Sequence, residues 1–596
     1  MELLNLDGVI EKGVFEIPSY QRGYAWQMKQ LEDFWSDLEH VSKLENKFHY
    51  MHSLTLRKSD DDFGDIDFEI IDGQQRLATS LILLGLLAKT TKNENYSLAN
   101  LKSILSYNFY YHDIGEAFRA IMEEEKDLER FQTSFYAKNL IDAYEFFQEK
   151  ISDTPVGTLE KMFDALIKKM LFSVVELNDN RIDPFSSFET INNRGKDLST
   201  LELLKNRLHF VVHKICNGQK LETLQKEIND TYTIIYYDLR QFEDDHLERF
   251  LKHFVAYYYG ENSKFKERLL NTAFDAHKKY DDLYDEYEKI NDLLFYLSYS
   301  SKVWHFLHTL DDEELRIEIT PKTRGLLDKM RRLNALSHDA FLPLLLSLFT
   351  IQLVKKSANK QPYTTKELES LLEYLERFGF LIYGVAGKKT AKNEWIGLAF
   401  KAIQAYRSWG DRITIEDLSN ARKEFFKGEH SGLELLEENI HSKKNTEKWY
   451  QWGKALNYLL YEYELHHNPE TTLNFDGSIE SIEHILPQKP DQGYSAKEKN
   501  WAKNPHIVHA LGNLLLIPKN ANSSLSNKPF NEKRKQYLKG SYSEKEVAKN
   551  ASFGVAQIKE RSEKLLDFLI ARYNIAELVG EDAIKDFKNA LLKEIK

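Results

Sequence analysis

The sequence is short of the residues that mark several classes of protein. It has one cysteine, Cys216, among 596 residues, which excludes an intramolecular disulfide and a zinc site built from several thiolates. It has only 26 glycines and 12 prolines, about half of their usual share. So few turn-forming residues argue against an all-β architecture. We therefore expect a mainly helical protein of the reducing intracellular compartment.

An excess of positive charge and a long apolar run are also missing. The chain has 81 basic and 93 acidic residues, a net charge of −12, so any contact with nucleic acid must be local. The longest apolar stretch, 340–354, includes Pro343 and is shorter than the roughly 20 residues of a membrane span. The first residues include Glu2 and Asp7 where a signal peptide would be basic. We expect a soluble, cytoplasmic protein without a targeting segment.

The amino-terminal part mixes short strand-like runs with one clear helix. Strand-like runs occupy 14–17, 49–56 and 68–71, and the last of them ends in a polar turn at 72–73. Leucines then follow at helical spacing from Leu77 onward, which predicts a strand, a tight turn and a helix. Farther along, Ser199 and Glu202 have the spacing of a capping box.

The remainder is dominated by long, charged amphipathic helices without a repeat of fixed period. We expect three domains: 1–210, a helical connector at 211–440, and 441–596. The window 501–550 carries nine Lys and Arg residues against three acidic ones, so it is the one clearly basic region. It is the natural place for a local contact with DNA.

A set of polar residues in the carboxy-terminal domain suits hydrolysis of a phosphodiester. Glu483 and His484 end an apolar strand, Asn513 precedes a second apolar run, and Asn522 lies nine residues farther on. A histidine can take a proton from water near neutral pH, while a carboxylate and an amide oxygen can bind a hard cation. An isolated histidine would be read as structural, but the complete set favours a one-metal hydrolytic site.

These residues resemble the HNH, or ββα-metal, nucleases. The match runs from Glu483 through Pro487 and Gln488 to a closing helix with Phe530, Lys533 and Tyr537, over about 60 residues. The resemblance implies that His484 is the general base, that Glu483 and Asn522 hold Mg²⁺ or Mn²⁺, and that Asn513 braces the histidine loop. For the lysines near 533, contact with phosphate and a solvated helix face are equal alternatives.

Two polar blocks in the amino-terminal domain suit a nucleotide. Asp72, Gly73, Gln74, Gln75 and Arg76 stand between a strand and a helix, where backbone N–H groups and the helix dipole favour an anion. Arg76 adds a donor fork for phosphate oxygens, and Asp72 could bind a bridging metal. A second block combines stacking rings with charge, as a base or nucleotide site does. Its members are Tyr20, Gln21, Arg22, Tyr24 and Trp26.

Together these blocks resemble the ParB/sulfiredoxin-like domain of modification-dependent restriction proteins. The third block of that pattern is present around Asn193 and Arg194, followed by Leu203 to Asn206. One departure lies in the strand-like run at 49–56, where this chain has His52 near the position at which the family often has glycine. We assign His52 no role.

The combination of both domains is similar to single-chain GmrSD-type (type IV) restriction endonucleases and the related SspE and BrxU groups. The resemblance implies a mainly α fold with small α+β parts: a ParB/sulfiredoxin-like α/β core, a helical connector, and a helical domain bearing the ββα-metal motif. It implies an NTP-regulated nuclease, using GTP or ATP and Mg²⁺ or Mn²⁺, that nicks or cuts modified phage DNA in antiphage defence. The oligomeric state stays open, with a homodimer as one option.

Two alternatives remain at this point. One is an NTP-switched DNA-binding or scaffold protein with a non-catalytic HNH fold, and the other is a toxin-like nuclease acting on RNA or unmodified DNA. The candidate residues fall into four groups. They are Glu483, His484, Asn513 and Asn522 for catalysis; Asp72, Gly73, Gln74, Gln75, Arg76, Asn193 and Arg194 for nucleotide; Tyr20, Gln21, Arg22, Tyr24 and Trp26 for sensing nucleotide or DNA; and Lys519, Lys528, Lys533 and Arg534 for DNA.

Overall fold

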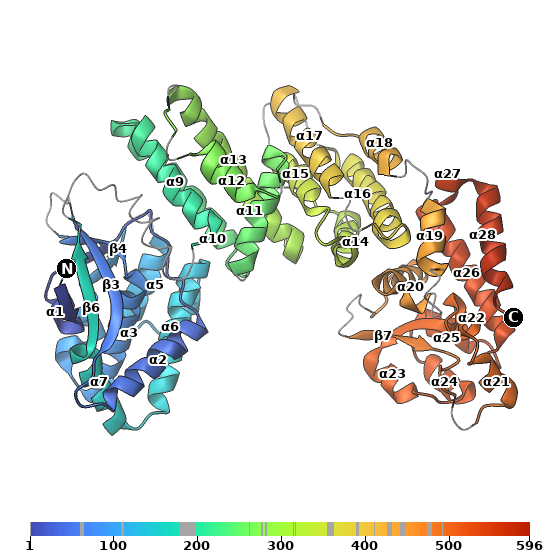
Figure 1. The fold of residues 1–596 in the computed structure, drawn as a ribbon, viewed down its shortest axis with the longest axis horizontal. Helices are drawn as coiled ribbons and strands as arrows, with labels where there is room; N and C mark the ends of the chain where they lie inside the picture. Colours follow the sequence, from blue (N-terminus) through green and yellow to red (C-terminus); the bar gives the residue numbers. More distant parts are fainter. Residues whose placement is uncertain are drawn as a thin grey trace. The chain divides into compact units, whose positions relative to one another are not determined.

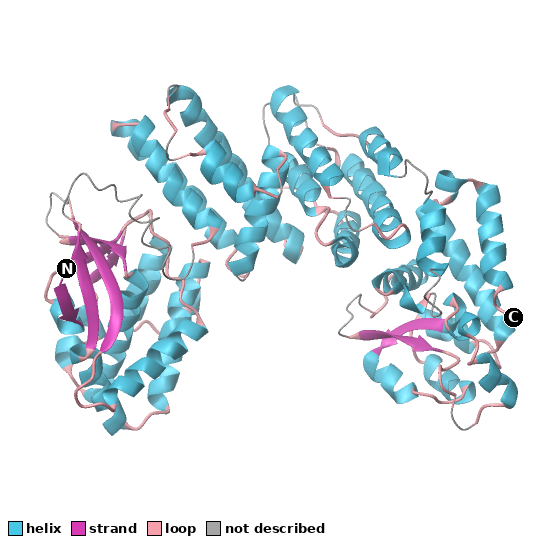
Figure 2. Cartoon of the chain, viewed as in Figure 1, coloured by secondary structure: helices cyan, strands magenta, loops and turns pink. Residues whose placement is uncertain are grey.

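The chain folds into two compact units, Met1–Leu315 and Arg316–Lys596. Helices dominate both units (Figure 2), so the prediction of a mainly helical protein is confirmed. The functional division at 210 and 440 stays a prediction. The computed structural model describes residues 2–59, 65–108, 112–177, 198–242, 244–261, 263–275, 278–280, 283–313, 315, 317–354, 363–388, 392–409, 412–425, 432–441, 449–473, 479–490 and 493–596.

A mixed six-stranded sheet forms the centre of the amino-terminal unit, with strand order β1-β6-β3-β4-β2-β5 (Figure 1). The β1–β6 and β3–β4 pairs are antiparallel, and the other three pairs are parallel. All three strand-like runs of the sequence are strands, which confirms those predictions. The strands are β1 (Glu2–Asn5), β2 (Phe15–Ile17), β3 (His49–Lys58), β4 (Phe68–Asp72), β5 (Leu105–Tyr107) and β6 (Met170–Glu176).

Helices α2, α3, α6 and α7 pack against one another on one side of this sheet (Figure 1). The predicted strand–turn–helix is present as β4, Gly73 and α3, and α9 begins with the predicted capping box of Ser199 and Glu202. The helices of this unit are α1 (Leu6–Ile10), α2 (Met28–Ser42), α3 (Gln74–Thr91), α4 (Leu98–Leu101), α5 (His112–Met122), α6 (Phe135–Ser152), α7 (Val156–Lys168), α9 (Thr200–Ile215), α10 (Gly218–Asp238), α11 (Asp244–Tyr259), α12 (Phe265–Glu267) and α13 (Leu283–Thr309).

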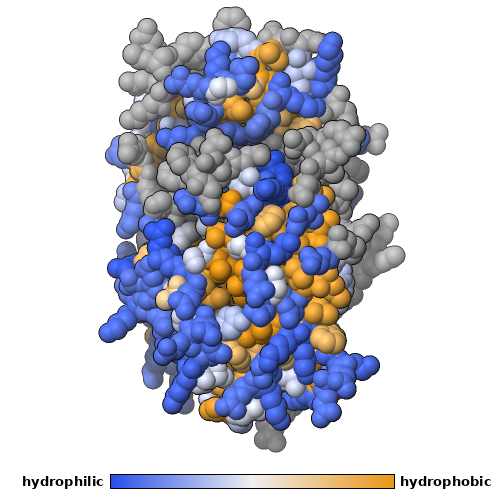
Figure 3. All heavy atoms as spheres, turned by 90° about the vertical axis from the view of Figure 1, so that its left-hand side faces the viewer, coloured by the Kyte–Doolittle hydropathy of each residue, from blue (hydrophilic) through white to orange (hydrophobic). Residues whose placement is uncertain are grey.

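Apolar side chains reach the surface on the side that Figure 3 turns toward the viewer, where orange residues lie among blue ones. In the amino-terminal unit, Leu3 on β1 is 59% exposed and Tyr50 on β3 is 52% exposed. Both strands pair with β6. The sheet therefore keeps some apolar side chains at the surface, which is normal for isolated residues.

The carboxy-terminal unit joins a helical part to a small two-stranded sheet. Strands β7 (Glu480–His484) and β8 (Leu514–Pro518) are antiparallel, and a helix begins directly after β8. Helices α20 and α26 contact both parts of the unit. Its helices are α14 (Pro321–Ser337), α15 (Leu342–Leu353), α16 (Thr365–Gly379), α17 (Asn393–Trp409), α18 (Ile415–Phe425), α19 (Gly432–His441), α20 (Lys454–His467), α21 (Ala496–Trp501), α22 (Pro505–Val508), α23 (Lys519–Leu525), α24 (Phe530–Tyr537), α25 (Tyr542–Ala548), α26 (Val555–Tyr573), α27 (Ala576–Val579) and α28 (Glu581–Lys593).

The most apolar stretch of the sequence is α15, which is buried within the carboxy-terminal unit and packs on α17. The prediction of a buried helix at 340–354 is therefore confirmed. In the described part of the chain, no helix combines the length and the apolar character that crossing a membrane requires.

Candidate functional site

His484 is the last residue of β7, opposite Leu514 of β8. The loop that follows it is held by Asn513, which is fully buried. Its Oδ1 accepts a hydrogen bond from the backbone N–H of Leu486 (2.7 Å), and its Nδ2 donates to the carbonyls of Leu486 (2.9 Å) and Val508 (2.7 Å). Asn513 thus lies where the resemblance places the brace of the histidine loop.

Gly512 is needed beside this brace for a steric reason. A Cβ atom at this position would lie 2.0 Å from the carbonyl oxygen of Ile558 and 2.6 Å from the backbone nitrogen of Ser562, both on α26. The Gly512 N–H donates to the Ser562 hydroxyl (2.8 Å), and Arg561 Nη1 donates to the Gly512 carbonyl (2.9 Å). Helix α26 therefore fixes the turn that carries Asn513.

The imidazole of His484 faces a second histidine. His484 Nε2 lies 3.1 Å from Nδ1 of His509, and the ring of Tyr450 lies 4.7 Å from the His484 ring between centroids. Burial, together with the neighbouring His509 and Lys533, lowers the pKa of His484 to about 3. The ring is therefore neutral at pH 7 and one of its nitrogens keeps a lone pair for a proton, but a pKa this low makes it a weak base in this enclosed arrangement.

His509 was missed in the sequence, although a signal was there. It lies four residues before Asn513, in the segment that leads into β8. Its position at the end of α22 brings it beside His484, 25 residues earlier. Gln488 also approaches the pair, with its Nε2 3.4 Å from each ring nitrogen of His484.

Glu483 forms a buried ion pair. Its Oε1 accepts hydrogen bonds from Lys533 Nζ (2.5 Å) and the Tyr537 hydroxyl (3.0 Å), and the Glu483 and Lys533 side chains are 5% and 0% exposed. Lys533 also donates to the carbonyl of His484 (2.8 Å). Burial raises the pKa of Glu483 and lowers that of Lys533. The phosphate contact predicted for Lys533 is therefore wrong, because its ammonium is enclosed and bound inside the domain.

The predicted metal ligands do not fit an open metal site in this arrangement. The Glu483 carboxylate is held by Lys533 and Tyr537, and a backbone hydrogen bond from His484 also acts on it. Asn522 turns its Nδ2 toward β7, donating to the Ser481 hydroxyl (2.8 Å) and the Ile482 carbonyl (3.1 Å). Within the described residues, no three His, Cys, Asp or Glu side chains gather as a metal ion requires. Ligation by Glu483 and Asn522 stays a prediction.

The remaining basic candidates differ in exposure. Lys519 and Lys528 are exposed and available to a phosphate. Arg534 is partly buried, and its Nε donates to the carbonyl of Ala548 (2.7 Å), at the end of α25. Two of the four predicted DNA contacts are therefore exposed at the surface of the domain.

The turn at the start of α3 depends on glycine. Gly73 has a φ of +101°, and a Cβ atom there would lie 3.0 Å from the Ser53 carbonyl oxygen and 2.9 Å from Leu54 Cδ1. The backbone conformation and the close approach of β3 together favour glycine. This turn places Gln74 and Gln75 at the first positions of the helix.

The glutamines join the two predicted blocks to each other. Gln75 Oε1 accepts from the Ala25 N–H (2.8 Å) and its Nε2 donates to the Gly23 carbonyl (2.9 Å). Gln74 Nε2 donates to the Arg22 carbonyl (2.8 Å), and Gln21 Nε2 donates to the Ile71 carbonyl (2.6 Å). All three glutamines are buried. The motif glutamines thus bind backbone, which explains structurally why the blocks occur together.

The aromatic members of the first block are mostly internal. Tyr24 is 1% exposed and its hydroxyl hydrogen-bonds to Thr79 (2.7 Å), so the predicted stacking of Tyr24 on a base does not fit its burial. Tyr20 is buried in a small cluster with Ile71. Trp26 is partly exposed and lies 5.9 Å from Phe34 between ring centroids. Among these rings, Trp26 is the one that keeps exposed area.

Asp72 and Arg76 form the accessible polar part of the turn. Each side chain is 20% exposed, and Arg76 Nη2 donates to Asp72 Oδ2 (3.1 Å) and to the Ser53 carbonyl (2.5 Å). The Ser53 hydroxyl also donates to Asp72 Oδ2 (3.0 Å). The preceding residue, His52, has a φ of +64° at an irregularity between β3 and β6. His52, near the position where the family often has glycine, thus has a left-handed backbone conformation here.

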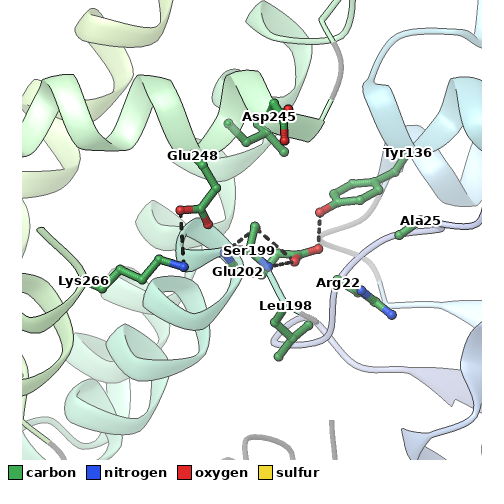
Figure 4. Close-up of a pocket in the computed structure, with 10 residues that line it drawn as sticks. Arg22, Ala25, Tyr136, Leu198, Ser199, Glu202, Asp245, Glu248 and Lys266 are labelled. Atoms are coloured by element: carbon green, nitrogen blue, oxygen red, sulfur yellow. Dashed lines mark hydrogen bonds and ion pairs between the residues drawn. The ribbon is translucent and has the colours of Figure 1, made fainter. Parts of the chain in front are cut away.

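A cavity of about 270 Å³ lies between the sheet part of this unit and the helices that follow (Figure 4). Arg22 lines it together with Glu202, which accepts from the Tyr136 hydroxyl (2.5 Å). Glu248 binds the first turn of α9 through the Thr200 N–H and hydroxyl, and pairs with Lys266 at 3.6 Å. Of the predicted nucleotide and sensing residues, the cavity therefore gathers Arg22 and not the Asp72–Arg76 pair.

Asn193 and Arg194 lie outside the described residues. The following block is described and is internal, because Lys205 and Asn206 on α9 are both buried. Burial lowers the pKa of Lys205 to about 7. Part of the third predicted block thus lies on the buried side of α9, inside the unit.

Comparison with protein families gives two matches. Residues 3–209 match the model described as GmrSD restriction endonuclease, N-terminal domain, and residues 436–568 match the model described as GmrSD restriction endonucleases, C-terminal domain. Together the matches cover more than half of the chain. The second match contains β7, β8 and the His484–His509 pair. No curated protein matches the chain.

Proposed function

The chain belongs to the GmrSD restriction endonuclease family, and from this membership we propose that it is a nucleotide-regulated endonuclease that nicks or cuts modified phage DNA. DNA as the substrate and a role in restriction follow from the family. The modification, the nucleotide and the metal are parts of the proposal. The small sheet β7–β8 with α23 would be its ββα-metal motif, and the amino-terminal sheet its ParB/sulfiredoxin-like core.

The observation that carries the nuclease proposal is the neutral, clamped imidazole of His484. In the proposed reaction, a water molecule gives one proton to His484 while its oxygen bonds to phosphorus. The bond from phosphorus to the leaving oxygen breaks, and that oxygen takes a proton from solvent. Asn513 contributes by fixing the loop after His484 through three hydrogen bonds, so that the ring is held before the substrate arrives.

We propose that Mg²⁺ or Mn²⁺ is required as well. Such an ion stabilises negative charge on a phosphate when bound. Because Glu483 is held by Lys533, its use as a ligand would require that ion pair to open. The proton transfer to His484 is independent of that rearrangement.

The amino-terminal domain would bind GTP or ATP at the turn before α3. Support comes from the first backbone N–H groups of an 18-residue helix, the Arg76 guanidinium and the partly exposed Asp72. Asp72→Ala and Arg76→Ala should each remove nucleotide hydrolysis and leave the proposed nuclease site at His484 unaltered. Release of phosphate from GTP and ATP by each variant checks this, and normal hydrolysis by both variants would reject the turn as the site.

Cleavage assays separate the nuclease from its alternatives. His484→Ala should lose cleavage, whereas His466→Ala, at an exposed histidine on α20, should cleave as the unaltered protein does. The substrates are phage DNA with glucosylated hydroxymethylcytosine, unmodified plasmid and RNA, each with Mg²⁺, Mn²⁺ or a chelator.

Each alternative has its own result in these assays. Undiminished cleavage by His484→Ala contradicts the assignment of the base. Absence of cleavage on every substrate favours the scaffold alternative. Cleavage of plasmid or RNA in preference to modified DNA favours the toxin alternative.

A further inference from the structure

The contact between His484 and His509 defines how the proton on His484 is placed. Their nearest ring nitrogens, His484 Nε2 and His509 Nδ1, lie 3.1 Å apart, and both residues are buried, at 7% and 6% exposure. This distance fits an N–H···N hydrogen bond. The ring of Tyr450 stacks on His509 at 5.6 Å between centroids and an interplanar angle of 23°. The relative position of the two imidazoles is therefore fixed by packing from a third element.

A neutral imidazole has one N–H donor and one acceptor nitrogen, so the pair has two arrangements. If Nε2 of His484 carries the proton, Nδ1 of His509 accepts it in the hydrogen bond, and Nδ1 of His484 is the basic nitrogen. In the reverse arrangement, Nδ1 of His509 carries the proton and donates it to Nε2 of His484. The lone pair of Nε2 then accepts this hydrogen bond and is not available to a water proton. Protons on both facing nitrogens would turn two N–H donors toward each other without an acceptor between them, which is unfavourable for buried groups.

We propose that His509 is the positioning residue of the nuclease site: it accepts the Nε2 proton of His484 and so leaves Nδ1 of His484 to take the proton from water. This inference rests on the proposed function of His484 as the base. When Nδ1 has taken the water proton, His484 is a cation whose Nε2–H still donates to His509. The same hydrogen bond therefore orients the base before the reaction and stabilises the charge that forms on it.

Matched substitutions at His509 separate its acceptor atom from its bulk. His509→Asn places an amide oxygen close to the position of Nδ1, and His509→Phe keeps a ring without an acceptor. We expect His509→Phe to lower kcat by about 100-fold with KM unchanged. His509→Asn should recover most of that loss. His506→Phe, on the same short helix at a histidine that is 42% exposed, is the control and should cleave normally.

The assay uses the full chain, supercoiled plasmid and phage DNA with glucosylated hydroxymethylcytosine, with Mn²⁺. Circular dichroism and hydrogen exchange of β7 and β8 show whether each variant is folded. Binding of Mn²⁺ alone is measured by calorimetry for the unaltered protein, His484→Ala and His509→Asn. His484→Ala serves as the reference for complete loss of the base.

The outcomes distinguish this inference from the function on which it rests. Normal cleavage by His484→Ala overturns the base itself. Loss in His484→Ala with normal kcat in His509→Phe overturns the positioning role alone. Folded His509→Asn with activity as low as that of His509→Phe also overturns it. If Mn²⁺ binding disappears in both His484→Ala and His509→Asn, the two nitrogens hold a metal ion, and the hydrogen-bond proposal is wrong.

Discussion

In both units an amide side chain clamps two stretches of backbone, but the groups beside the clamp differ. Gln75 joins α3 to Gly23 and Ala25, and the charged groups near it are the partly exposed Asp72 and Arg76. Asn513 joins the loop after His484 to α22, and beside it lie two buried imidazoles. Amides of a motif therefore stabilise loops in either unit, while the groups beside them differ: two buried imidazoles in one unit and a partly exposed ion pair in the other.

The largest expected difference between the two regions concerns their ion pairs. Glu483–Lys533 is enclosed, so Lys533→Met leaves a buried carboxylate without its partner and should cost about 3–5 kcal/mol of local stability. Asp72–Arg76 is partly exposed, and Asp72→Asn should cost less than about 1 kcal/mol. Hydrogen exchange of β7 in the first variant and of α3 in the second measures both losses.

A double variant tests the reason for this difference. Glu483→Gln combined with Lys533→Met removes both buried charges, so it should recover much of the stability that Lys533→Met alone loses. Equal exchange rates in the single and double variants would show that the lysine matters through packing rather than through its charge.

Acidification gives a second comparison, because each unit contains a buried neutral histidine. Burial and the neighbouring Lys205 lower the pKa of His209 on α9 to about 3, while His213 disfavours and Asn229 favours its charged form. The unfolded state binds the proton at an ordinary pKa near 6.5, so stability is present above that pH and is lost as pH falls toward 3. The amino-terminal unit should lose roughly 1.5 kcal/mol between pH 6.5 and pH 5 through this residue.

His209→Leu removes the titrating group and should flatten this pH dependence. Urea unfolding and hydrogen exchange of α9, each at pH 6.5 and at pH 5, measure the effect. His506→Leu, at a partly exposed histidine of the other unit, is the control and should leave the pH dependence of α9 unchanged. An equally steep loss in His209→Leu would show that other groups cause it.

Removing the clamps should separate folding from catalysis. Gln75→Ala leaves the Ala25 N–H and the Gly23 carbonyl without their partner, which should cost about 1–3 kcal/mol. Asn513→Ala likewise removes the hydrogen-bond partner of the Leu486 and Val508 carbonyls and of the Leu486 N–H. It also releases the loop after His484. We expect Gln75→Ala to keep DNA cleavage and Asn513→Ala to lose it, each measured beside the unfolding midpoint. Equal loss of cleavage in Gln75→Ala and Asn513→Ala would show that the two amides do not differ in their effect on catalysis.

The sequence predicted the local parts of this structure well, because they depend on neighbouring residues. The strand, turn and helix around Gly73 and the capping box of Ser199 require only short-range patterns. Resemblance placed Asn513 beside the histidine loop. Lys533 was assigned to the surface because a lysine within a basic run is normally solvated, and only its pairing with Glu483, 50 residues earlier, shows otherwise.

His509 and Tyr24 show the same limit from two sides. The position of His509 four residues before Asn513 is a weak local signal, but its contact with His484, 25 residues earlier in the chain, is visible only in the fold. Tyr24 belongs to a block whose composition favours stacking on a base, yet it is buried and its hydroxyl forms a hydrogen bond with Thr79. Which aromatic or charged side chains remain accessible is decided by packing between elements, and a one-dimensional pattern does not contain that information.

The smallest expected effect concerns the exposed lysines of the basic window. Lys528 is exposed, so if it contacts a phosphate, Lys528→Ala should weaken DNA binding by less than about tenfold and lower the salt slope by about 1. Lys585→Ala, at an exposed lysine on α28 outside that window, is the matched control and should leave the slope unchanged. Filter binding of one DNA duplex at several salt concentrations measures both.

Because Lys533 is enclosed, the effect of its removal on binding should come from local unfolding instead, and hydrogen exchange of β7 then changes together with affinity. A lower slope in Lys528→Ala with unchanged exchange separates direct phosphate contact from support of the fold, whereas equal slopes in the Lys528 and Lys585 variants would place the DNA path elsewhere on this unit.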